Sequence, residues 1–91
     1  MLRIITEHNG CDYQLALHGS VSGEWIAVLD RHWAHIRHAA PAAEIRIDLS
    51  NVVFIDADGE RLLRRMKRDG VTFDGAGVMT RYVIEKVSGG L

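Results

Sequence analysis

Two carboxylates, Asp56 and Asp58, are the residues of this chain best placed for chemistry. They follow the apolar run 52–55 and precede Gly59, so the pattern predicts a polar, glycine-containing turn between a strand and a helix. Ligands and partners of α/β sheets gather at this carboxyl end of the strands. The helix N-terminus there has unpaired N–H groups and a partial positive charge. The simpler interpretation is that Asp56 and Asp58 only cap the helix, each contributing about 0.3–1 kcal/mol.

The helix predicted after this turn is rich in arginine. Four arginines fall within about 100° of one another on a helical wheel: Arg61, Arg64, Arg65 and Arg68. One interpretation is an ordinary solvated face, softened by Glu60. The other is a docking stripe for an acidic surface or for phosphates, because the planar guanidinium group donates paired hydrogen bonds to such groups.

Three histidines at three-residue spacing invite a metal hypothesis: His32, His35 and His38. That spacing spreads them over about 120° of a helix, so at best His32 and His35 could share one ion. We therefore expect histidines packed in the core or at its rim, and no metal or cofactor. Trp25 and Trp33 are likewise expected in the core or at its rim rather than as a nucleotide-stacking pair.

The elements that must position these residues alternate between short strands and helices. Strands are predicted at 2–6, 13–18, 44–49 with 52–55, and 71–73; helices are predicted from after Gly23 to about His38, from Asp56 to about Asp69, and from about Met79 to Val87. The uninterrupted apolar run 52–55 is typical of a strand end buried on both faces. The order β-β-α-β-α-β-α predicts an α/β fold with a small mixed four-stranded sheet packed with about three helices.

Length and composition favour a binding module over an enzyme. The chain has 91 residues, of which 47% are hydrophobic and 25% charged, so residues 1–91 are expected to form one domain. Such a domain has no room for a second lobe or a deep cleft that excludes water. The net charge of −1 favours neither nucleic acid nor an anionic membrane as the main partner.

A cytoplasmic location is expected. Residues 1–10 contain Arg3, Glu7 and His8, a pattern unlike a signal peptide or a membrane span. Cys11 is the single cysteine, which fits a reducing compartment.

The stretch from Asp48 to Gly59 resembles the STAS domain, named for sulfate transporters and anti-sigma factor antagonists. The residues concerned are Asp48-Leu49-Ser50 followed by Phe54-Ile55-Asp56 and Gly59, with Leu17-His18-Gly19-Ser20-Val21 before the first helix. The resemblance covers roughly residues 2–88. It implies a four-stranded mixed sheet, no catalytic activity, and a protein-binding role in bacterial partner switching and regulation of transcription. In the antagonists, a partner kinase phosphorylates a serine in this turn, and phosphorylation abolishes binding.

The chain departs from the antagonist motif Asp-Ser-Ser-Gly at the phosphorylated position. Ala57 stands where the acceptor serine would be, and Asp58 replaces the second serine. A phosphate adds a charge of about −1.5 to −2, whereas Asp58 supplies a single negative charge. We therefore expect a turn that serine phosphorylation cannot switch, unless phosphate is transferred to nearby Ser50.

Two partner classes are compatible with the STAS resemblance. One is an anti-sigma factor kinase, which would make this chain an always-available antagonist. The other is the ATPase of an ABC transporter, because STAS-like subunits of transporters can act without phosphorylation. In either case the expected contact surface is the turn Asp56–Gly59 with the adjoining arginine-rich helix.

The segment from Val53 to Gly59 also resembles the haloacid dehalogenase phosphatase motif Asp-x-Asp-Gly. There the first aspartate is the nucleophile, the second is an acid/base, and both serve a magnesium site. The later paired-aspartate element of that family is missing, since Asp69 and Asp74 stand alone. A magnesium-dependent phosphatase is therefore the least favoured alternative.

The last residues, 88–91, bear on self-association. STAS relatives typically continue beyond the third helix, whereas this sequence stops at Leu91. The surface that the missing part would cover is expected to be exposed or covered by another subunit, so a homodimer is a third possibility.

Overall fold

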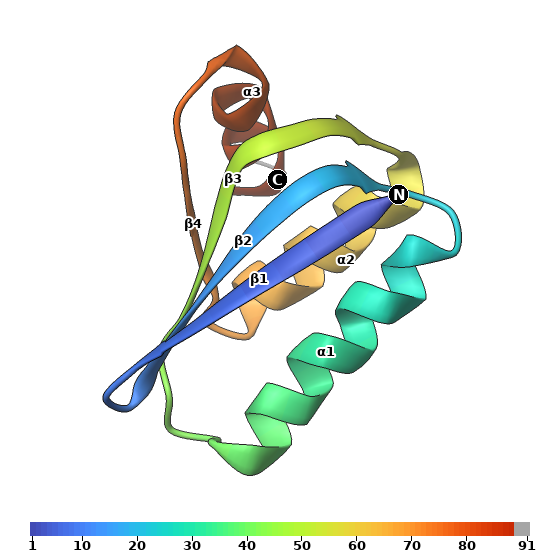
Figure 1. Cartoon of the computed structure of the whole chain (residues 1–91). Coiled ribbons are helices and arrows are strands. Elements are labelled where there is room, and N and C mark those ends of the chain that lie inside the picture. Colours follow the sequence, from blue (N-terminus) through green and yellow to red (C-terminus); the bar gives the residue numbers. More distant parts are fainter. Residues whose placement is uncertain (89–91) are drawn as a thin grey trace.

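A computed structural model of the chain describes residues 1–88, which form four strands and three helices (Figure 1). The strands are β1 (Leu2–Asn9), β2 (Asp12–Val21), β3 (Ile45–Ile55) and β4 (Thr72–Asp74). The helices are α1 (Trp25–Ala39), α2 (Ala57–Arg68) and α3 (Val78–Ser88). The spatial order is β1-β2-β3-β4, with β1 antiparallel to β2 and the other neighbours parallel. The predicted α/β fold with a mixed four-stranded sheet is confirmed.

A tight hairpin begins the sheet. Asn9 pairs with Asp12, which leaves Gly10 and Cys11 as a two-residue loop. Gly10 has a φ of 66°, and Cys11 does not have a positive φ. This is the sign pattern of a type II′ turn, whose first central position favours glycine and whose twist suits paired strands.

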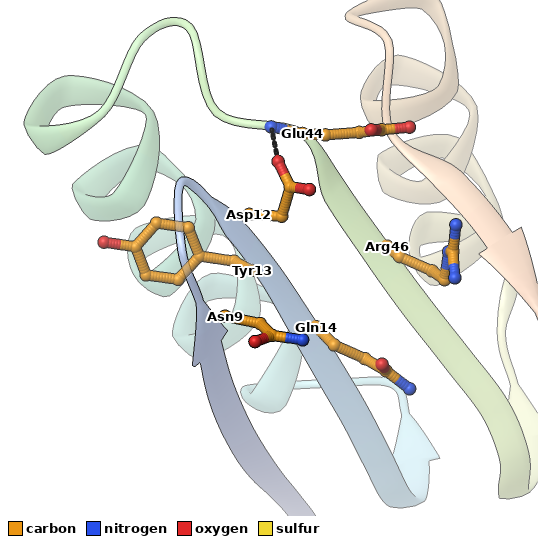
Figure 2. A pocket seen from close by; sticks show the side chains of 6 residues that line it. All are labelled: Asn9, Asp12, Tyr13, Gln14, Glu44 and Arg46. Carbon is orange, nitrogen blue, oxygen red and sulfur yellow. Dashed lines mark hydrogen bonds between the residues drawn. The ribbon is translucent and has the colours of Figure 1, made fainter.

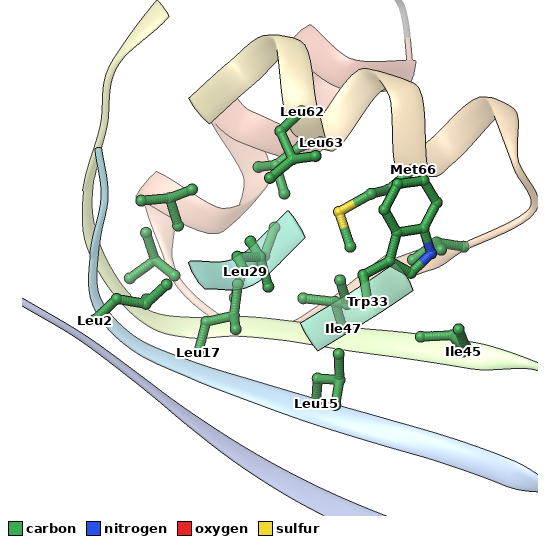
Figure 3. Packing of buried hydrophobic residues seen from close by; sticks show 14 of the residues in the cluster. Leu2, Leu15, Leu17, Leu29, Trp33, Ile45, Ile47, Leu62, Leu63 and Met66 are labelled. Carbon is green, nitrogen blue, oxygen red and sulfur yellow. The ribbon is translucent and has the colours of Figure 1, made fainter. Parts of the chain in front are cut away.

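One core lies between the sheet and the helices (Figure 3). Side chains that alternate along the strands meet the apolar stripes of α1 and α2. The buried set includes Leu15, Leu17, Ile45, Ile47, Leu29, Trp33, Leu62, Leu63 and Met66. The intervening strand residues, such as Arg3, Gln14 and Arg46, are exposed on the other face of the sheet.

The tryptophans of α1 and His32 lie at the core or its rim as the sequence predicts, whereas the same prediction for His35 and His38 is wrong. His32 is half-buried and its Nε2 lies 2.9 Å from Thr6 Oγ1, which ties α1 to β1. His35 and His38 are exposed. Trp33 is buried and Trp25 packs partly buried against the core.

The end of β3 differs from its prediction. Residues 45–55 form one strand, with register shifts against β2, where two separate segments are predicted. The prediction that 52–55 is buried on both faces is wrong, because Val53 is 67% exposed and Phe54 is 53% exposed. The physical reason is that the core covers only one face of the sheet, so Val52 is buried while Val53 is exposed. In addition, β4 pairs only with Arg46–Asp48, so within residues 1–88 no strand lies beyond the end of β3.

Candidate functional site

The turn between β3 and α2 is organised by Asp56. Asp56 has extended backbone and is the N-cap of α2, where its Oδ1 accepts a hydrogen bond of 2.7 Å from Gly59 N–H. Its Oδ2 accepts a second hydrogen bond, of 3.2 Å, from Gly23 N–H in the loop before α1. One carboxylate therefore satisfies an orphan donor of α2 and also holds the neighbouring loop.

The rest of this turn is open to solvent. Ala57 and Asp58 are exposed, and Asp58 forms an ion pair with Arg61 one turn further along α2. Gly59 is buried against β2, where an added Cβ would lie 2.2 Å from the carbonyl oxygen of Val21. Residues 56–59, named the acidic turn below, thus present the Asp58 carboxylate outward while Asp56 and Gly59 fix the backbone.

The arginines of α2 divide into tethered and outward-facing side chains. Arg65 pairs with Asp30 of α1 at 2.8 Å and lies over the Trp33 ring, 5.8 Å from its centroid. Arg61 and Arg68 are exposed, and within residues 1–88 Arg68 forms no ion pair.

Arg64 joins α2 to α3. Its Nη2 donates to Glu60 Oε1 at 2.9 Å and to the carbonyl oxygen of Lys86 at 3.3 Å. Its Nε is buried and makes no hydrogen bond in the described part of the chain. Arg64 therefore links the two helices. Of the four arginines of α2, Arg61 and Arg68 are the two that form no ion pair or hydrogen bond with another helix within residues 1–88, so their side chains are accessible to a binding partner.

An apolar pocket that the sequence does not predict adjoins the acidic turn. It has a volume of about 150 Å³ and is lined by Phe54, Ile55, Glu60, Tyr82, Val83 and Lys86. Phe54 is 53% exposed and Tyr82 is 57% exposed. Ile55 and Glu60, which line the pocket, flank the acidic turn in sequence, so the pocket begins next to this turn. The sequence feature that could have indicated this pocket is the unbroken apolar run that ends directly before Asp56.

The motif Asp48-Leu49-Ser50 positions α3, and hence Tyr82. Asp48 Oδ1 accepts hydrogen bonds from Ser50 Oγ at 2.6 Å and from Ser50 N–H at 2.9 Å. Ser50 Oγ in turn accepts from Ala76 N–H at 2.8 Å, in the loop before α3. The buried Thr80 hydroxyl of α3 donates to the Leu49 carbonyl oxygen at 2.8 Å.

This network also sets the ionisation of Asp48. The hydrogen bonds from the Ser50 side chain and backbone hold the pKa of the Asp48 carboxyl below its usual value. The nearby His18 acts in the same direction, and burial opposes both. Such short-range Asp-x-Ser bonding is a known local pattern, but its link to the loop before α3 depends on tertiary packing.

A second hollow lies at the hairpin end of the sheet (Figure 2). It has a volume of about 120 Å³ and is lined by Asn9, Asp12, Tyr13, Gln14, Glu44 and Arg46. Asp12 Oδ1 accepts a long hydrogen bond of 3.4 Å from Glu44 N–H (Figure 2). This hollow is at the amino ends of the parallel strands, away from the end where ligands of α/β sheets gather.

In the part of the chain that the structure describes, the two aspartates of the acidic turn are not joined by a third side chain that could hold a metal. In residues 1–88, no group of at least three His, Cys, Asp or Glu side chains is arranged to hold a metal ion. The Asp56 carboxylate also accepts hydrogen bonds from two backbone N–H groups, those of Gly23 and Gly59. The magnesium-dependent phosphatase alternative therefore gains no support from the geometry.

None of the helices in residues 1–88 combines the length and the apolar character needed to cross a membrane.

Comparison with known proteins assigns no family. A scan against protein-family models finds no match, and a search of curated proteins finds none either. The STAS resemblance thus remains a proposal that depends on the residues of the central motif.

Proposed function

We propose that this chain is a non-catalytic protein-binding module of the STAS type that acts in the cytoplasm. Its contact surface is the acidic turn with the adjoining apolar pocket and the outward-facing arginines of α2. The observation that carries the proposal is the exposure of two large aromatic side chains, Phe54 and Tyr82, around that pocket. Exposed apolar surface rimmed by charge is typical of protein interaction sites.

The charges around the pocket supply the rim of such a site. Glu60 and Lys86 line the pocket, and Lys86 Nζ lies 5.7 Å from the centroid of the Tyr82 ring. Asp58, Arg61 and the more distant Arg68 add charges of both signs. Aromatic side chains in the centre carry most of the affinity in known interfaces, while rim charges mainly set specificity and association rate.

The residue at position 57 separates the two partner classes. Ala57 has no hydroxyl group, so a kinase cannot release this surface by modifying that position. The nearby Ser50 hydroxyl is already engaged with Asp48 and Ala76. This favours a partner that needs no phosphorylation cycle, so a transporter ATPase is preferred over an anti-sigma factor kinase.

Photo-crosslinking in cell extract tests this function. Benzoylphenylalanine is placed at position 54 or 82, and at Val28 as a control, since Val28 is 39% exposed on α1 and lies outside the pocket. We expect one protein to be crosslinked from positions 54 and 82 and not from 28, with mass spectrometry identifying a transporter ATPase. Recovery of a kinase would support the antagonist alternative. The same crosslinking pattern from all three positions would contradict the proposed surface.

A further inference from the structure

Among residues 1–88, no strand pairs with the outer edge of β1, which is a long strand edge. β1 has eight residues and is the first strand of the sheet, so one of its sides faces solvent (Figure 1). Its pairing with β2 is continuous from Leu2 to Asn9, with no bulge or proline to interrupt it. Such an edge is a template for pairing with another strand.

The hairpin determines which backbone groups point outward. In an antiparallel pair, residues alternate between those bonded to the partner strand and those whose N–H and C=O groups point away. Ser20 N–H donates to the Met1 carbonyl oxygen at 2.9 Å, so Met1 bonds to β2. Tyr13, which lies opposite His8, instead donates its N–H away from β1, to the Glu44 carbonyl oxygen at 2.9 Å. Odd-numbered residues of β1 therefore bond to β2, and even-numbered residues, from Leu2 to His8, present free backbone groups at the edge.

When the β1 edges of two copies pair antiparallel, only one register places outward backbone groups opposite each other and also opposite charges next to each other. When Ile5 of one copy lies opposite Ile5 of the other, Ile4 faces Thr6 with outward backbone groups on both. Arg3 then lies opposite Glu7 on the open face of the sheet, twice by symmetry. The neighbouring allowed registers place Arg3 against itself or against Ile5, or Glu7 against itself or against Ile5.

The side chains in this register are free to make these contacts. Arg3 and Glu7 are exposed, and neither forms an ion pair within residues 1–88. Ile5 is 38% exposed, although it is a large apolar residue. Residues 3, 5 and 7 would form non-hydrogen-bonded pairs, in which opposing side chains approach most closely.

We propose that two copies of this chain associate through antiparallel pairing of β1 with β1, centred on Ile5. The two sheets join into one, and both helical layers lie on the same side of it. The inference does not depend on the proposed function, because β1 is at the opposite edge of the sheet from β4 and contributes no residue to the pocket. A dimer of this kind would present two copies of the protein-binding surface.

Disulfide trapping tests the register directly. Cys11→Ser first removes the exposed native thiol. In this background, Ile5→Cys places the Cα atoms of the two introduced cysteines about 4.5 Å apart in the dimer, which is within the range of a disulfide. Glu7→Cys is the matched control, because its two copies would lie roughly 13 Å apart along the strands. We expect oxidation to give a covalent dimer with Ile5→Cys and not with Glu7→Cys. A monomer with Ile5→Cys, or equal trapping at both positions, would overturn the proposal.

Charge exchange tests the same interface without a crosslink. Arg3→Glu or Glu7→Arg alone places like charges opposite each other, and we expect each to raise the dimer Kd at least roughly ten-fold. The double variant Arg3→Glu/Glu7→Arg restores opposite charges and should return the Kd to near the wild-type value. Sedimentation equilibrium measures all four proteins. A wild-type chain that stays monomeric, or single variants that dimerise as well as the wild type, would contradict the interface.

Discussion

Gly59 is required by the space around it rather than by its backbone angles. A Cβ at this position would lie 2.2 Å from the Val21 carbonyl oxygen, so the start of α2 would have to move away from β2. We expect Gly59→Ala to lower the free energy of unfolding by about 1–3 kcal/mol, as overpacking does elsewhere. Urea denaturation measures the change. Arg68→Ala on the exposed side of the same helix is the control, expected within about 0.5 kcal/mol of wild type. A fully stable Gly59→Ala protein would contradict this packing.

Asp56 and Asp58 are expected to differ sharply although they are two residues apart. Asp56→Ala removes an acceptor from Gly59 N–H and from Gly23 N–H, and should cost about 1–2 kcal/mol of unfolding free energy. Asp56→Asn keeps an acceptor oxygen and should retain most of the stability. Asp58→Ala removes only an exposed ion pair with Arg61, so a change below about 1 kcal/mol is expected. Equal losses at both positions in urea denaturation would refute the division of roles.

Asp48 should contribute to the stability of the fold in a pH-dependent way. Its pKa is lowered in the folded state by hydrogen bonds from Ser50, so the stabilisation is complete above the unfolded-state pKa of about 3.8. It is lost as the pH falls through the lower, folded-state pKa. We expect the wild type to lose more unfolding free energy than Asp48→Asn between pH 5 and acid conditions below the unfolded-state pKa. Parallel acid profiles of the two proteins would contradict the role of the Ser50 bonds.

At the scale of elements, Arg64 connects two helices that carry the two halves of the binding surface. Arg64→Ala removes hydrogen bonds to Glu60 and to the Lys86 carbonyl oxygen, and because the side chain is partly exposed we expect a loss of only about 1–2 kcal/mol. Amide hydrogen exchange should show weaker protection in α3 than in the wild type. Lys67→Ala, at an exposed position of α2, is the control. Unchanged protection of α3 would contradict this role of Arg64.

The elements themselves could be predicted because their signals are local. Alternation in 13–18 and 44–49, the helical period after Gly59, and the Asp-containing turn each lie within a few residues of sequence. The exposure of Phe54 could not be predicted, because it depends on how far β4 extends beside β3.

The partners of the arginines are likewise set by tertiary packing. Arg65 meets Asp30 only because α1 packs beside α2, and Arg64 meets Lys86 only because α3 does. A helical wheel places these arginines on one stripe but does not show which of them a neighbouring helix engages. The acidic turn was therefore predictable from sequence, whereas the pocket that completes the candidate site was not.

At the scale of the whole molecule, the proposed surfaces lie at different edges of the sheet. The binding surface lies at the end of β3 with α2 and α3, whereas the proposed dimer contact is the outer edge of β1. A dimer would thus display two binding surfaces, and a multimeric partner would be bound with a gain in avidity. Arg3→Glu should then weaken binding to an immobilised, multivalent partner while leaving one-to-one affinity in solution unchanged. Equal loss in both formats would show that the two surfaces are coupled.

The most direct test of the binding surface is the affinity of the crosslinked partner, once purified, for Phe54→Ser and for Val28→Ser. Both residues are exposed apolar side chains, at 53% and 39%, but only Phe54 lines the pocket. Isothermal titration calorimetry should show a Kd raised by roughly 30-fold or more for Phe54→Ser, equivalent to about 2 kcal/mol, and an unchanged Kd for Val28→Ser. An unchanged Kd for Phe54→Ser, in a protein as stable as the wild type, would contradict the account.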